Sequence, residues 1–114
     1  MKLSISNPDL DLKSKKKSKY SGIPQYHVIL WDDNDHSYEY VIEMLIKIFS
    51  HSVEVAFKMA REVDTCGRVI VETTSMERAE FKRDQIHAYG SDWRIPHCKG
   101  SMSATIEPFE DPAS

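Results

Sequence analysis

Cysteine is scarce in this sequence of 114 residues, and long apolar runs are missing. The two cysteines, Cys66 and Cys98, form no CxxC pair, which argues against a disulfide framework or a zinc knuckle and predicts a reducing, cytoplasmic setting. The longest apolar stretch, residues 40–49, is interrupted by Glu43 and Lys47 and is too short for a membrane helix. The start of the chain lacks the apolar segment of a secretory signal. We therefore expect one domain that does not contact membranes.

Positive charge is concentrated near the N-terminus. Residues 1–24 carry a formal charge of +4, whereas residues 25–114 carry −7. An acidic domain is a poor partner for nucleic acid, because a phosphate backbone selects clustered cations. The Lys-rich stretch 13–19 is either a weak polyanion site or a solvated tail. Since residues 1–24 lack apolar periodicity, we expect them to be disordered, with the folded domain at 25–108 and a frayed end at 109–114.

Hydrophobic periodicity predicts three strands and three helices in the order βααβαβ. Ser37 and Ser52 are expected N-caps of the first two helices, Gly67 a left-handed C-cap, and Thr74–Glu77 a capping box that starts the third. This order is typical of a two-layer α+β domain with a three-stranded, largely antiparallel sheet against helices. The expected strands are 25–31, 68–73 and 101–107, and the expected helices are 38–49, 53–65 and 76–89.

The helix expected at 53–65 has an apolar face at helical spacing. We expect this face to be buried in the core. Its members are Val53, Ala56, Phe57, Ala60 and Val63.

The acidic turn at 32–36 has three interpretations. It is an ordinary turn that caps the next helix, a hard-cation site if further oxygens complete the shell, or a clamp for an ammonium group. His36 is read as a solvated side chain and His97-Cys98 as an exposed loop pair, because neither has partners at a recognised zinc spacing. No nucleophile elbow, HExxH or paired-carboxylate pattern is present, so we expect no enzyme, cofactor or metal.

Several segments in order resemble ClpS-type protease adaptors over residues 25–108. The segment YHVILWDDN (26–34) followed by YEYVI (38–42) resembles the family's aliphatic strand, acidic turn and helix start. Gly67 and the segment SMERAEFK (75–82) are similar to its later glycine and T-x-E-x-A-E-x-K motif, and ATIE (104–107) to its last strand. The family's βααβαβ fold agrees with the order expected from periodicity.

The resemblance implies a function and a site. Members bind substrates that begin with Leu, Phe, Tyr or Trp and deliver them to the ClpA- or ClpC-type unfoldase of a ClpP protease. The resemblance implies that Glu77 and Lys82 dock on the unfoldase N-domain. It also implies a monomer whose N-terminal tail is offered to the unfoldase when the substrate is handed over. The α-amino group would be held by Asp32, Asp33 and Asp64, and the first side chain by a pocket of Leu30, Tyr38, Val41, Ala60, Val63 and Met102.

The residues depart from the family pattern at the implied site. Asp32 replaces an asparagine, Asn34 an aspartate, Asp64 a histidine, and Ala60 a bulkier side chain. Converging carboxylates raise at least one pKa, so we expect a bound ammonium to relieve their repulsion and affinity to fall below about pH 5. The alternative is a diverged member that docks on the unfoldase but has lost N-terminus binding and acts as a regulator or recruiter.

Overall fold

The computed structural model describes residues 22–110, so most of the expected N-terminal disorder and of the frayed end lies outside the described residues. Six elements follow one another in the predicted order βααβαβ, which confirms the α+β class. No helix within 22–110 is long and apolar enough to cross a membrane. The elements are β1 (Gln25–Trp31), α2 (Tyr38–Phe49), α3 (Val53–Cys66), β2 (Arg68–Thr74), α4 (Met76–His87) and β3 (Ala104–Phe109).

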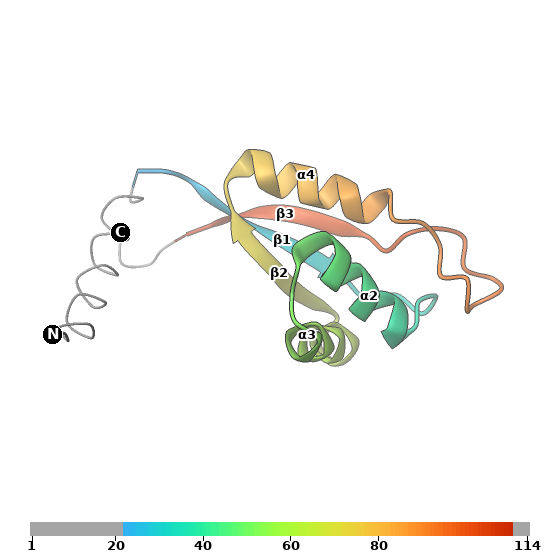
Figure 1. Cartoon of the computed structure of the whole chain (residues 1–114). Coiled ribbons are helices and arrows are strands. Elements are labelled where there is room, and N and C mark those ends of the chain that lie inside the picture. Colours follow the sequence, from blue (N-terminus) through green and yellow to red (C-terminus); the bar gives the residue numbers. More distant parts are fainter. Residues whose placement is uncertain (1–21, 111–114) are drawn as a thin grey trace, which may run out of the picture.

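The sheet is built around β1, which pairs antiparallel with β2 on one side and with β3 on the other. Val28, Ile29 and Leu30 are fully buried in this central strand. A register shift between Val28 and Ile29 interrupts the pairing with β2. In Figure 1, α4 runs along the sheet beside β3, while α2 and α3 lie together near the C-terminal end of β1. The acidic turn after β1 therefore points toward α2 and α3.

Serine hydroxyls start all three helices. Ser37, Ser52 and Ser75 each accept a hydrogen bond from the backbone N–H three residues later, which satisfies an otherwise unpaired donor. Gly67 ends α3 with φ 88°, in the left-handed region that its missing Cβ allows. The capping box expected at Thr74–Glu77 is wrong, because Thr74 still belongs to β2 and Ser75 caps α4.

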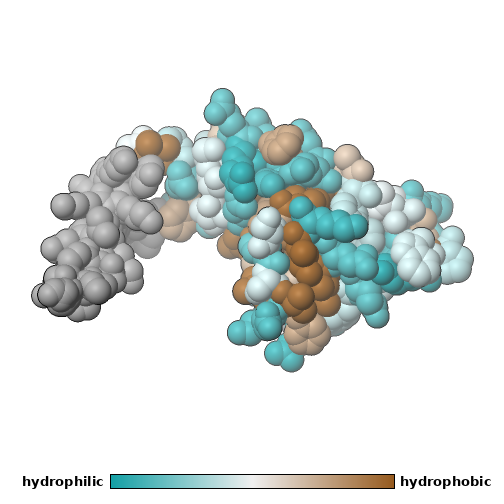
Figure 2. Space-filling view, viewed as in Figure 1, coloured by the Kyte–Doolittle hydropathy of each residue, from teal (hydrophilic) through white to brown (hydrophobic). Residues whose placement is uncertain are grey.

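Three further expectations need correction. The last strand begins at Ala104 and includes Phe109, so the frayed end does not start at 109. Helix α4 ends at His87. Val53 and Phe57 of α3 are 61% and 44% exposed rather than buried. Figure 2 shows apolar side chains gathered on the surface over the region of α2 and α3. Apolar spacing located α3 correctly but overstated how much of its face the small core covers.

Candidate functional site

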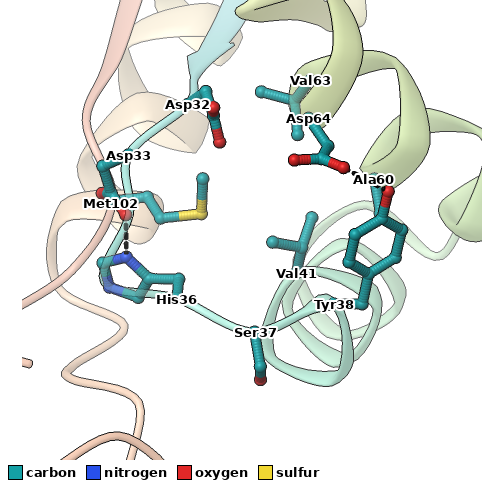
Figure 3. A pocket seen from close by; sticks show the side chains of 10 residues that line it. All are labelled: Asp32, Asp33, His36, Ser37, Tyr38, Val41, Ala60, Val63, Asp64 and Met102. Carbon is teal, nitrogen blue, oxygen red and sulfur yellow. Dashed lines mark hydrogen bonds and ion pairs between the residues drawn. The ribbon is translucent and has the colours of Figure 1, made fainter.

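A cavity that opens to solvent lies where the end of β1 approaches the start of α2 and the end of α3. Its rim is acidic, and four apolar side chains form part of its wall. The segment before β3 adds one thioether side chain (Figure 3). The lining residues are Asp32, Asp33, His36, Ser37, Tyr38, Val41, Ala60, Val63, Asp64 and Met102.

Asp32 and Asp64 face each other across this cavity (Figure 3). Asp32 follows β1, where its backbone N–H donates to the Gly67 carbonyl at 3.0 Å, so the turn is fastened to the C-terminus of α3. Partial burial and then the negative charge of Asp64 raise the pKa of Asp32 above its usual 3.8. The two carboxylates thus repel each other, and a cation between them would relieve that repulsion.

Tyr38 holds Asp64 in place from the start of α2. Its hydroxyl donates to Asp64 Oδ2 at 2.7 Å. This hydrogen bond is the main reason that the pKa of Tyr38 is raised, so the hydroxyl remains a donor at neutral pH. One oxygen of Asp64 is engaged in this way, which leaves the other carboxylate oxygen for a ligand.

Asp33 does not join that pair. Its Oδ1 accepts the Asp35 backbone N–H at 2.9 Å and contacts His36 Nδ1 at 2.7 Å. In Figure 3 it lies beside His36, on the other side of the cavity from Asp64. The His36 side chain is only 3% exposed, so its interpretation as a solvated histidine was wrong. The structure therefore gives the acidic cluster a basic partner that sequence reasoning missed.

The segment between α4 and β3 supports the residue that caps α2. Asp92 is 1% exposed, and its Oδ2 accepts both the backbone N–H and the hydroxyl of Ser37 at 2.7 Å. Burial opposes ionisation, but these bonds and those from Arg94 outweigh it and lower the pKa of Asp92 to about 2. The buried Asp92 carboxylate thereby anchors Ser37, which caps α2 and lines the cavity. No sequence pattern links the two, since they are 55 positions apart.

Five of the six residues expected to form the side-chain pocket line the cavity. Tyr38, Val41, Ala60 and Val63 line the cavity, and Met102 joins them although it precedes β3 instead of belonging to it. Leu30 is not a lining residue, because it is fully buried in the core of the sheet.

The two residues expected to dock on an unfoldase differ in their surroundings. Glu77 is exposed on the first turn of α4. Lys82 is only 8% exposed, and its Nζ donates to the Ile48 carbonyl at 2.5 Å, so it caps the C-terminal end of α2. Lys82 is therefore not part of a solvated face, and its docking role stays a prediction.

Metal chemistry has little support in the described residues. Across 22–110, no group of three or more His, Cys, Asp or Glu side chains is arranged to hold a metal ion. His97 is exposed as expected and lies 3.5 Å from Asp35 Oδ1, whereas Cys98 is half-buried, with its sulfur 3.3 Å from His36 Nε2. The two residues of the expected loop pair thus point to different partners.

Comparison with known proteins identifies the class. The sequence model of a family described as "ATP-dependent Clp protease adaptor protein ClpS" matches residues 22–96. The ATP-dependent Clp protease adapter protein ClpS of Vibrio cholerae is 34% identical over 90 residues, which cover 79% of this chain and 85% of that protein. The ClpS of Vibrio atlanticus is 32% identical over 91 residues, covering 80% and 86%.

A solved structure shares the fold. Agrobacterium tumefaciens ClpS2 bound to L-phenylalaninamide matches with a TM-score of 0.65 at 22% identity, over 75% of this chain and 98% of that one. These matches place the protein among protease adaptors, which are not enzymes. The chain belongs to the ClpS family of adaptors of the ATP-dependent Clp protease.

Proposed function

We propose that this adaptor binds the free N-terminus of substrates whose first residue is hydrophobic, and that it delivers them to a ClpA- or ClpC-type unfoldase. The observation that carries the proposal is the pair of opposed carboxylates, Asp32 and Asp64, at the rim of a hollow with four apolar side chains in its wall. The phenylalaninamide in the related ClpS2 structure has both groups that such a site would bind: a free amino group and an aromatic side chain.

The chemistry of the ligand matches both halves of the site. A free α-amino group has a pKa of about 8, so at neutral pH it is mostly a cation with three donors. Each charge-assisted hydrogen bond contributes roughly 1.5–3 kcal/mol, and burial of a Leu- or Phe-sized side chain contributes roughly 1.5–3 kcal/mol. After the cost of association, two such bonds and the pocket support micromolar affinity.

Protonation of the rim sets an acid limit on binding. Asp32 binds an ammonium group as a carboxylate, and its pKa is raised by burial and by Asp64. As the pH falls through that raised pKa, Asp32 gains a proton and the attraction is lost. We expect affinity to fall below about pH 5, although the bound cation itself favours the charged form and moves the loss to lower pH.

Fluorescence anisotropy with labelled Phe- and Leu-initiated peptides tests the proposal. N-terminal acetylation removes the cation and should abolish binding, and Asp32→Asn or Asp64→Asn should weaken it about tenfold or more. Glu62→Gln is the matched control, because this exposed α3 carboxylate does not line the cavity. Equal binding of free and acetylated peptides would refute the ammonium clamp.

A second candidate is a diverged adaptor that docks on the unfoldase without binding N-termini. It is favoured by the Tyr38 hydroxyl, which already occupies one oxygen of Asp64. This candidate predicts no binding of either peptide but retained association with an unfoldase N-domain. A pull-down with that domain, using Glu77→Lys as the docking variant, separates the two. For either candidate we expect a cytoplasmic monomer.

A further inference from the structure

His36 lies between two hydrogen-bond acceptors. Its Nδ1 is 2.7 Å from Asp33 Oδ1, and its Nε2 is 2.7 Å from the Gly100 carbonyl oxygen. A carboxylate and a carbonyl oxygen only accept, so both bonds form together only when both ring nitrogens carry protons. The contacts therefore select the imidazolium form of the ring.

We propose that His36 is a positioning residue for the N-terminus site and acts as this doubly protonated ring; the proposal rests on the proposed function. The cation neutralises Asp33 and fixes its orientation. It also ties the segment after α4 to the acidic turn through Gly100, two residues before Met102 of the pocket wall. Asp32 and Asp64 then remain as the pair available to the incoming ammonium.

The other groups around the ring do not replace Asp33 as its counter-ion. The Tyr40 ring lies 4.5 Å away, and burial raises the pKa of its hydroxyl to about 12, so it is neutral. The Cys98 sulfur is 3.3 Å from Nε2 and also contacts the Gly100 carbonyl. Among the charged neighbours, Asp35 faces His97.

Asp92, the remaining carboxylate of this region, is already bonded to Ser37 and Arg94. Its charge is thus compensated without His36. The ring and Asp33 form a separate ion pair at the turn, and the protonation of this ring decides whether that pair exists.

Loss of one proton disrupts one of the two anchors. If Nδ1 is bare, its lone pair faces the Asp33 carboxylate; if Nε2 is bare, it faces the Gly100 carbonyl. Histidine changes charge between about pH 5 and 8. The site thus has two limits: Asp32 must be ionised, and His36 must be protonated. We expect affinity to decrease from mildly acidic to alkaline pH beyond the decrease caused by titration of the ligand.

The binding test compares the dissociation constant of a Phe-initiated peptide for His36→Gln and for the unmodified protein. The same peptide is used throughout, so titration of its amino group cancels in the ratio. We expect the variant to bind about tenfold more weakly near pH 6 and about equally near pH 8.5. His97→Gln, an exposed histidine of the neighbouring segment, is the control and should give a ratio near one at both values.

Nitrogen NMR of the unmodified protein provides a second measurement that needs no variant. Near pH 6, the His36 shifts should report protons on both ring nitrogens. A neutral ring, or a ratio that does not change with pH, would overturn the inference while the proposed function stands. If the unmodified protein fails to bind the free peptide, the proposed function fails and the positioning role fails with it.

Discussion

Replacing the buried Asp92 by asparagine should destabilise the protein in a pH-dependent way. The carboxylate accepts four hydrogen bonds, two from Ser37 and two from Arg94. In Asp92→Asn, an amide NH₂ replaces one carboxylate oxygen. This NH₂ then faces N–H or O–H donors where the oxygen had accepted their hydrogen bonds. The charge that strengthens these bonds is also lost.

The lowered pKa of Asp92 gives the size of the expected loss of stability. Its fall from 3.8 to about 2, at 1.36 kcal/mol per unit, corresponds to about 2 kcal/mol of stability. Because the folded-state pKa is lowered, this contribution is complete above the unfolded-state value of 3.8 and is lost as the pH falls through about 2. Near pH 3, about half of it should remain. A typical domain has 5–15 kcal/mol in total, so the loss at neutral pH is large.

Urea unfolding of both proteins at neutral pH and near pH 3 measures the difference. The destabilisation should be about 2 kcal/mol at neutral pH and about half of that at the lower value. Asp84→Asn is the control, because that side chain is 67% exposed and should change stability little at either pH. An equal loss at both pH values would show that packing, not charge, makes Asp92 important.

Three further substitutions test the site and its support. Asp64→Asn should lower the pKa of Asp32 toward 3.8 in an NMR titration, raise the urea midpoint slightly at neutral pH and weaken binding of a Phe-initiated peptide. Ala60→Met should narrow the cavity and reduce affinity for Trp-initiated peptides more than for Leu-initiated ones in anisotropy measurements. Lys82→Met leaves the Ile48 carbonyl at the end of α2 without its buried donor and should cost about 1–3 kcal/mol in urea unfolding, whereas Lys58→Gln, on an exposed position, should be neutral.

The fold could be predicted where local patterns and burial agree. The strand at 25–31 contains the continuous apolar run 28–31 and occupies the centre of the sheet. Serine caps marked the starts of α2 and α3. The exposure of Val53 and Phe57 could not be predicted in this way, because helical spacing identifies an apolar face but not how far the core extends to cover it.

The site was predictable only in part for a similar reason. Asp32 and Asp64 were expected to converge through a resemblance, and the structure brings them face to face. His36 follows Asp33 by three residues, a separation that allows a side-chain contact within a turn, and this spacing was the one available signal for its role. Asp92 gave no signal, because its partner Ser37 is reached only through the packing of a 16-residue segment after α4 against the start of α2.

The arrangement of charges explains how three aspartates can lie at one site. His36 compensates Asp33, and hydrogen bonds from Ser37 and Arg94 compensate the buried Asp92 outside the cavity. Asp32 and Asp64 alone remain opposed, and both are exposed, so water reduces their repulsion. An apolar side chain that fills the hollow would exclude part of this water and strengthen the attraction of both carboxylates for an ammonium group on the same ligand. Each half of a hydrophobic N-terminal residue would therefore improve the binding of the other half.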